Sequence, residues 1–335
     1  MDSLLVLTLL IVIFALAFDF INGFHDTANT IATSVSTRAL RPRVAILLAA
    51  SMNFLGALTF TGVAETIGKG IVNPFTLNDG AVGSVIVLAA LISAIVWNLL
   101  TWLLGIPSSS SHAIVGSLAG AGIAALGFNA LNYAGFIGII EALIISPITA
   151  LAIGFCIMKL FMVIFKNSGL SKTNRGFRIF QIFTAALQSF THGTNDAQKA
   201  MGIITLALVA AHYHASMEIP IWVRFASAVA MATGTSIGGW KIVKTVGTKI
   251  MKIKPINGAA ADLASSGIIF GFTFLHLPVS STHVISSSIM GVGSAERVKN
   301  VNWGMAINIV ITWIITLPIT ALLAAIIYKI LAIFI

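Results

Sequence analysis

Apolar runs of about 20 residues or more fill most of this 335-residue chain, and only short polar segments separate them. Hydrophobic residues make up 58% of the sequence and charged residues only 9%, which is too few for an ordinary water-exposed surface. Because a helix needs about 20 apolar residues to cross a bilayer, such runs are typical of transmembrane helices. The sequence therefore predicts an all-α polytopic membrane protein.

The lysines and arginines are concentrated in the short segments between the apolar runs. An excess of Lys and Arg in short loops marks the cytoplasmic side. We therefore expect a multi-pass protein of the cell membrane, with basic loops in the cytoplasm and both termini outside. The net charge of +9 then reflects orientation, and no nucleic-acid partner is expected. The loop residues are Arg38, Arg41, Arg43, Lys166, Lys172, Arg175, Arg178, Lys241, Lys244, Lys249, Lys252, Lys254, Arg297 and Lys299.

The charge map divides the chain into two halves with about five crossings each, or about 10–12 in all if broken spans count twice. Residues 1–165 form the first half, 166–178 a basic cytoplasmic linker and 179–335 the second half. The basic turn 38–43 corresponds to a loop without Lys or Arg, whereas the external loop 64–81, with Glu65 and Asp79, corresponds to the most basic loop. This reversal predicts two inverted-topology repeats. The predicted spans are 3–37, 44–63, 82–104, 107–127, 135–165, 179–210, 220–240, 259–276, 278–294 and 303–332.

Similar short motifs recur in the two halves at a nearly constant offset of about 170 residues. Asp26 corresponds to Asp196. Pro107, Ser110 and His112 correspond to Pro278, Ser281 and His283, and Pro147-Ile148-Thr149-Ala150-Leu151 recurs as Pro318-Ile319-Thr320-Ala321-Leu322. These landmarks favour an internal repeat.

Glycine and proline predict broken or re-entrant helices at the membrane midplane, near Gly23, Gly193, Pro107 and Pro278. In transporters built from inverted repeats, such breaks flank the substrate site. Helices that begin after the two prolines would present free N–H groups and a positive dipole end to an anion. Hydroxyl side chains that bond to their own helix are the structural alternative. The predicted anion-binding hydroxyls are Ser109, Ser110, Ser111, Ser280, Ser281 and Thr282.

Ionisable and amide residues lie inside the first span of each half, where a charge is unfavourable and usually functional. Asp26 and Asn29 share one helix face, and so do Asn195, Asp196 and Lys199. Lys199 could neutralise an anion, and the two acids could bind a cation or a proton. A structural Lys199–Asp196 ion pair remains the alternative.

The flanking histidines and one further acid remain open between a structural and a functional role. His25 and His192 lie beside the acids and could titrate near neutral pH. Asp19 precedes the first break, and its side chain could face the same cavity as Asp26 or have no role in the site. His112 and His283 are open between packing and a site role.

Enzyme motifs give no support for catalysis. Gly234-Thr235-Ser236-Ile237-Gly238 matches the G-x-S-x-G pattern, but that motif requires a strand and a sharp turn, whereas this copy lies in an apolar helix. The sequence has no Walker lysine motif and no zinc-ligand spacing. We therefore expect no enzymatic activity and no cofactor beyond a co-transported H⁺ or Na⁺, with a divalent metal as a further option.

The motifs Gly23-Phe24-His25-Asp26-Thr27-Ala28-Asn29 and His192-Gly193-Thr194-Asn195-Asp196-Ala197-Gln198-Lys199 closely resemble the paired signatures of the inorganic phosphate transporter (Pit) family, bacterial low-affinity type. The resemblance extends to Glu65-Thr66-Ile67-Gly68-Lys69-Gly70 and spans nearly the whole chain. It implies phosphate held between broken helices, a homodimer, and import driven by a cation. The resemblance assigns Asp26, Asn29, Asn195, Asp196 and Lys199 to the substrate and cation site, the serine runs to phosphate contact, and Glu65 to transport.

The resemblance leaves the substrate and the coupling ion open, because the family includes proton-coupled and sodium-coupled phosphate carriers, metal-phosphate carriers and sulfate permeases. The Phe24-His25-Asp26 form is more similar to the proton-linked type, with Asp26, Asp196, His25 and Glu65 as coupling residues. The expectation is alternating-access phosphate import with protons. An anion channel is the alternative from another class, although it has no need of paired carboxylates.

Overall fold

The computed structural model describes residues 3–72, 80–168 and 170–334, and these residues form helices without a β-strand. Asp79 lies outside the described residues. The first half contains α1 (Ser3–His25), α2 (Thr27–Ser36), α3 (Pro42–Ala57), α4 (Gly62–Gly70), α5 (Gly80–Leu104), α6 (Ser110–Leu126), the 3-10 turn η1 (Phe128–Ala130) and α7 (Tyr133–Ile164). The second half contains α8 (Leu170–Asp196), α9 (Gln198–Ala210), α10 (Ile221–Ile237), α11 (Trp240–Lys244), the π-helical η2 (Thr245–Lys249), α12 (Pro255–Phe274), α13 (Ser281–Glu296), the 3-10 turn η3 (Val298–Asn300) and α14 (Trp303–Leu331).

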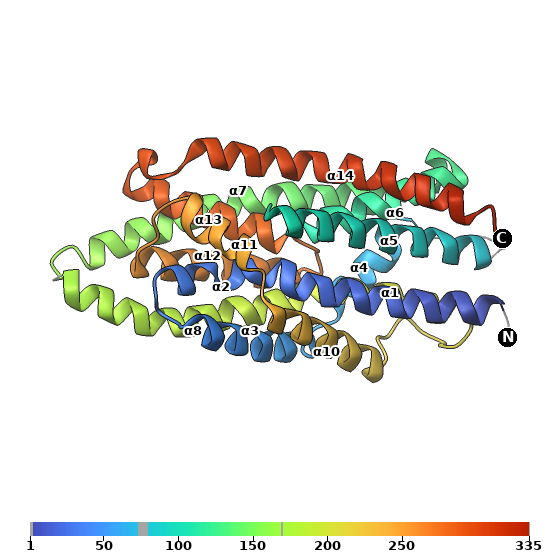
Figure 1. The fold of residues 1–335 in the computed structure, drawn as a ribbon, viewed down its shortest axis with the longest axis horizontal. Coiled ribbons are helices and arrows are strands. Elements are labelled where there is room, and N and C mark those ends of the chain that lie inside the picture. The colour runs from blue at the N-terminus through green and yellow to red at the C-terminus, as the bar shows by residue number, and fades with distance from the viewer. Residues whose placement is uncertain (1–2, 73–79, 169, 335) are drawn as a thin grey trace.

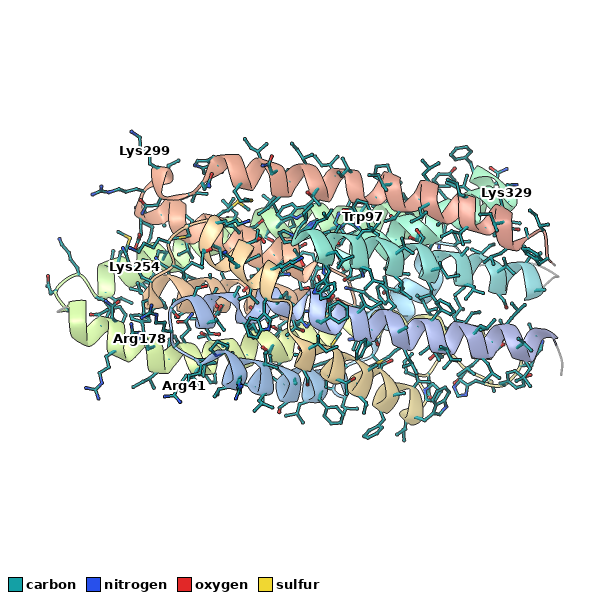
Figure 2. All side chains as sticks on the ribbon, in the orientation of Figure 1. Arg41, Trp97, Arg178, Lys254, Lys299 and Lys329 are labelled. Atoms are coloured by element: carbon teal, nitrogen blue, oxygen red, sulfur yellow. The ribbon has the colours of Figure 1, made fainter. Side chains whose placement is uncertain are left out.

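The helices lie along one long axis, and the two chain ends lie at the same end of the bundle (Figure 1). α1 starts at that end, whereas α8 starts at the opposite end, so the two helices run in opposite directions. Figure 2 shows Arg41, Arg178, Lys254 and Lys299 together at the end far from the termini, and Lys329 near the C-terminus. This arrangement agrees with the separation of charge expected from the sequence. Which end faces the cytoplasm stays a prediction.

The two halves repeat the same local structures. α6 and α13 both start three residues after a proline, and in both a serine caps the first turn: Ser109 Oγ accepts from His112 N at 3.1 Å, and Ser280 Oγ accepts from His283 N at 3.3 Å. α7 and α14 both follow a 3-10 turn and an asparagine cap. The halves interlock, because α6 packs against α14 and α7 packs against α13. These matching local structures agree with the internal repeat that the sequence indicates, and the division into two inverted repeats stays a prediction.

Several predicted spans are built from shorter pieces. By length and composition, four described helices can cross a membrane, or up to five if α3 and α4, bent by 75°, count as one span. The predicted external loop 64–81 is wrong over residues 64–70, because they belong to α4, whose Ala64 and Ile67 are buried. The most basic loop likewise contains α11 and η2, with Ile242 and Val246 buried. Its lysines are Lys241, Lys244, Lys249, Lys252 and Lys254. The count of 10–12 crossings stays a prediction.

The breaks predicted at Gly23 and Gly193 lie slightly further along the chain. α1 ends at His25 and α8 ends at Asp196, so the helices are interrupted at Asp26 and Ala197, with both residues still in the right-handed helical region. The glycines serve close packing instead: a Cβ on Gly23 would lie 2.2 Å from Met231 O, and one on Gly193 would lie 2.4 Å from Asn53 O. The interruptions separate two apolar cores, one around Phe18 and Ile67 and one around Ile31 and Val246.

Adding a methyl group at Gly234 is expected to destabilise the α1–α10 contact. A Cβ there would lie 1.9 Å from Phe20 O, so the backbones must separate. Overpacking of this kind costs about 1–3 kcal/mol. Gly234→Ala should therefore lower the midpoint of thermal unfolding in detergent. Gly267→Ala is the matched control, because a Cβ at Gly267 meets nothing within 4 Å; equal midpoints for the two variants would contradict the packing role.

Candidate functional site

The site lies where the two interrupted helices, α1–α2 and α8–α9, meet. Asp26 is 1% exposed, and Asp196, His192 and Lys199 are 0% exposed. One ligand atom each from Asp26, His192 and Asp196 lies within 4.8 Å of the others. The acids predicted from the two halves are thus brought together in a cluster that is buried from solvent.

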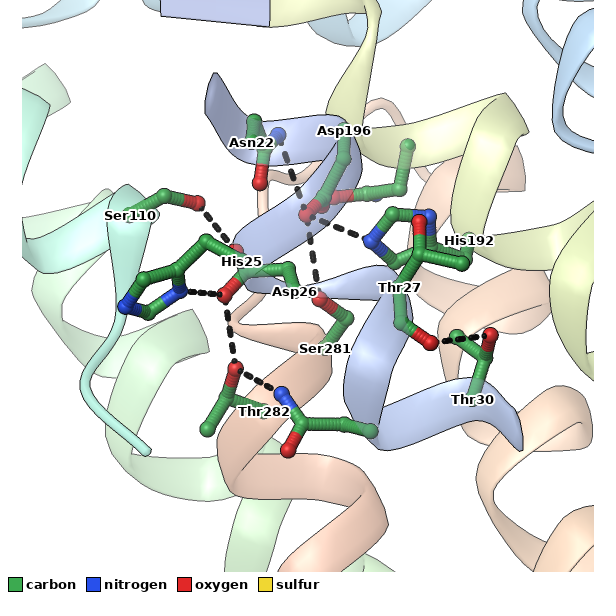
Figure 3. A network of polar contacts seen from close by, with 12 residues as sticks. Asn22, His25, Asp26, Thr27, Thr30, Ser110, His192, Asp196, Ser281 and Thr282 are labelled. Atoms are coloured by element: carbon green, nitrogen blue, oxygen red, sulfur yellow. Dashed lines mark hydrogen bonds and ion pairs between the residues drawn. The ribbon is translucent and has the colours of Figure 1, made fainter. Parts of the chain in front are cut away.

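Asp26 accepts hydrogen bonds from three side chains on three elements (Figure 3). Ser110 Oγ, in the first turn of α6, donates to Oδ2 at 2.5 Å. Thr282 Oγ1, in the first turn of α13, donates to Oδ1 at 3.0 Å, and His25 Nδ1 lies 2.7 Å from the same oxygen. Since the helix starts are fixed by the Pro and Ser residues, the hydroxyls are held by local structure. Asp26 therefore links both halves.

Asp196 has a richer set of partners. Lys199 Nζ donates to Oδ1 at 2.8 Å. Around Oδ2 lie Ser281 Oγ at 3.0 Å, His192 Nε2 at 3.3 Å and Asn22 Nδ2 at 3.5 Å (Figure 3). Ser281 matches Ser110 in the repeat, so each aspartate is bound by the equivalent serine of its own half. Each aspartate also has one partner from the other half, Thr282 for Asp26 and Asn22 for Asp196.

The other polar residues predicted from the sequence lie around Asp26 and Asp196, and most of their side-chain polar groups are hydrogen-bonded to other protein groups. Asn29 Nδ2 donates to Thr282 Oγ1 at 2.8 Å, and its Oδ1 has no partner among the described residues. Asn195 Nδ2 donates to Thr273 Oγ1 at 2.9 Å, and its Oδ1 accepts from Val279 N at 3.2 Å. Ser111 Oγ donates to Val279 O at 2.7 Å. Ser109 and Ser280 are occupied as helix caps, so Ser110, Ser281 and Thr282 are the hydroxyls that reach the acids.

Glu65 is not brought to this site. It is exposed and lines a polar surface hollow of about 750 Å³ together with Glu218, Arg224 and His276. His112 and His283 also lie apart from the acids: their ring centroids are 4.4 Å apart, and His283 stacks on Trp313 at 3.8 Å. Both histidines border an apolar groove of about 520 Å³.

Asn22, Asn53, Thr101 and Ser108 belong to the site's surroundings but do not emerge from the motifs. His25 Nε2 lies 3.0 Å from Thr101 Oγ1 and 3.4 Å from Ser108 Oγ, and Asn53 Oδ1 lies 3.0 Å from His192 Nδ1. Asn22 could have been found from its position one turn before Asp26 on the same helix. Asn53 and Thr101 lie on helices without another site residue, and only tertiary contact reveals them.

The site therefore combines two carboxylates, two imidazoles, one ammonium group and several hydroxyl and amide donors. A bound oxyanion can take over the Lys199 ammonium and the hydroxyl donors, provided that the carboxylates are neutralised at the same time. A cation or protons at the Asp26, His192 and Asp196 group would supply that neutralisation. The chemistry fits joint binding of an anion and a cation.

The serine of the G-x-S-x-G match is not part of any such cluster. Ser236 is exposed on α10 and donates to Ala232 O of its own helix at 3.1 Å. Packing explains the motif, because Gly234 lies against α1.

Comparisons with known proteins agree on one family. The family model described as "Phosphate transporter family" matches residues 22–172 and 166–324. A Bacillus subtilis protein named "Probable low-affinity inorganic phosphate transporter" is 69% identical over 99% of both chains, and a Rhizobium meliloti protein of the same name is 45% identical over 98% of both. A solved structure described as "The sodium-dependent phosphate transporter" has a TM-score of 0.88 and 27% identity, covering 98% of this chain and 100% of that one. The match to the family model over most of the chain and the 69% identity to the Bacillus subtilis protein show that the chain belongs to the phosphate transporter family.

Proposed function

We propose that this multi-pass membrane protein imports inorganic phosphate together with protons, by alternating access of its two halves. The observation that carries the proposal is the buried cluster in which Asp26, Asp196 and Lys199 converge with donors from both halves. Phosphate would take hydrogen bonds from Lys199, Ser110, Ser281 and Thr282, with Asn29 and Asn195 completing its surroundings. The names of the relatives support inorganic phosphate as the substrate. Transport of phosphate as a metal complex is part of the same proposal.

The histidine–aspartate pairs favour protons as the coupling ion. His25 lies 2.7 Å from Asp26, and His192 lies 3.3 Å from Asp196. Imidazole exchanges protons near neutral pH, whereas hard cations prefer oxygen ligands. Sodium coupling is the second candidate, because the solved relative is described as sodium-dependent. Glu65 lines the polar surface hollow, and ions would enter there from the outer side.

Alternating access requires bonds that hold the halves together in this closed state and break in others. Thr282 to Asp26 and Asn22 to Asp196 are such bonds, since each joins one half to the other. We place the protein in the cell membrane with its termini outside and its basic loops in the cytoplasm, as a homodimer that needs no bound cofactor. The function is transport and not catalysis.

Uptake of labelled phosphate into proteoliposomes tests the function and its coupling. With an inward proton gradient and no sodium, the purified protein should accumulate phosphate above its external concentration, and collapsing the pH gradient should stop accumulation. Uptake that follows a sodium gradient and ignores pH would overturn proton coupling. Equilibration without accumulation would indicate a channel, and competition by sulfate at equal strength would overturn phosphate selectivity.

A further inference from the structure

Asp19 is a buried acid that the phosphate site does not use. It is 0% exposed on α1, and neither carboxylate oxygen has a hydrogen-bond partner among the described residues. Other buried acids are satisfied: Asp262, for example, accepts from Thr33 Oγ1 at 2.7 Å and from Thr184 Oγ1 at 3.0 Å. An ionised carboxylate without partners is very unfavourable in apolar surroundings. Asp19 must therefore be neutral in this conformation.

The helices around Asp19 provide no free positive charge to neutralise it. α1 packs against α2, α5, α9 and α10, and α2 and α5 carry no charged residue. The charges that act on Asp19 are those of Lys199 and Asp196, and Lys199 Nζ is already bound to Asp196 at 2.8 Å. On α10, Arg224 lines the outer hollow, and its Nε donates to Ile219 O at 3.2 Å.

Ser227 on α10 is a polar neighbour of Asp19. Its hydroxyl is also fully buried and has no hydrogen-bond partner among the described residues. A hard cation such as Ca²⁺ or Mg²⁺ takes about six or more oxygen ligands, more than this carboxylate and hydroxyl provide. A proton needs a single oxygen, and a protonated carboxyl group can donate to a hydroxyl. A proton therefore fits this place, and a metal ion does not.

We propose that Asp19 is a proton-binding site of the transport cycle. Its carboxylate takes up a proton to reach the conformation seen here, forming an O–H bond, and releases the proton to water when the helices around it separate. This proposal rests on the proton coupling proposed above and deepens it.

Asp19 is well placed to act on the phosphate site. It lies on one face of α1 with Asn22 and Asp26, about 10 Å before Asp26 at 1.5 Å per residue, on the side of the chain termini. Asn22, between them, reaches Asp196 with its Nδ2, while its Oδ1 has no hydrogen-bond partner among the described residues (Figure 3). A movement of this part of α1 that follows protonation of Asp19 would therefore act on Asp196 through Asn22.

Infrared spectroscopy of the full-length protein in lipid tests the proton directly. A protonated buried carboxyl group gives a carbonyl stretch that an ionised one lacks. We expect this band at neutral pH, its loss in Asp19→Asn and a shift of its frequency in Ser227→Ala, which keeps the carboxyl group and serves if Asp19→Asn does not fold. A spectrum without the band, or one that both variants leave unchanged, would overturn the proposal.

Transport assays separate this proposal from the proposed function. In Asp19→Asn, uptake driven by a pH gradient should fall at least about tenfold, within the range of typical coupling effects, and residual phosphate exchange should lose its pH dependence. Thr8→Val on the same helix is the control, because within the described part of the chain Thr8 bonds only to Leu4 O, at 2.8 Å, and uptake should match that of the unmodified protein. If the unmodified protein responds to pH and Asp19→Asn responds equally, the role of Asp19 is wrong. If the unmodified protein ignores pH, proton coupling itself is wrong.

Discussion

Lys199→Ala is expected to abolish phosphate uptake while the protein still reaches the membrane. Lys199 is fully buried, and its ammonium group is the positive charge bound to Asp196 at 2.8 Å. In the proposed site this ammonium group would also pair with the bound phosphate, and truncating one partner of a buried charge pair across a binding interface typically costs about 2–5 kcal/mol. At 1.4 kcal/mol per tenfold change, the affinity for phosphate should fall by about 30- to 3,000-fold. Labelled uptake and equilibrium phosphate binding measure the two effects.

A purely structural ion pair would give a different result. In that case Lys199→Ala and Asp196→Asn would lower the thermal midpoint, but the protein that remained folded would transport normally. Lys329→Ala is the matched control, because Lys329 is an exposed lysine near the C-terminus (Figure 2). Near-normal uptake per folded molecule in both site variants would assign the pair to stability alone.

Local sequence rules predict much of the site because its parts are short-range. Pro107 and Pro278 lie between two helices, and the serines that follow them cap the next helix, so the starts of α6 and α13 are readable from the chain. Likewise, the spacing of Asp196 and Lys199 places them on one helix face, where the structure has them bonded.

The rest depends on contacts between distant segments. No local rule shows that Thr282 reaches Asp26 or that Asn22 reaches Asp196, because the bonded residues are 256 and 174 positions apart in the sequence. Gly23 suggested a helix break, but the structure shows that its missing side chain lets α10 pack closely against α1. This contact depends on a helix about 200 residues further along the chain and cannot be read locally. The loop predicted around Glu65 failed for the same reason: α4 is short and only modestly apolar, and it is held in place by packing on α9.

Asp26→Asn is expected to reduce uptake at least about 100-fold, with little loss of folded protein. Asparagine keeps the shape of the side chain, but its amide nitrogen cannot accept a hydrogen bond. In one rotamer the bond from Ser110 is lost, and in the other the bonds from Thr282 and His25 are lost. Hydrogen bonds to a charged group contribute about 1.5–3 kcal/mol each, and two weakened bonds correspond to about 100-fold or more. Neutralisation also removes the place where a coupled proton or cation would bind.

Asp262→Asn is the control for burial alone. Asp262 is as buried as Asp26 and also accepts hydroxyl bonds from both halves, through Thr33 and Thr184, but it contacts neither Lys199 nor the serines of α6 and α13 among the described contacts. If burial of any acid between the halves sets the transport rate, both variants lose uptake equally. If Asp26 acts through the phosphate site, Asp262→Asn keeps uptake and Asp26→Asn loses it, because only Asp26 bonds directly to the start of α6 and, through Thr282, to the start of α13.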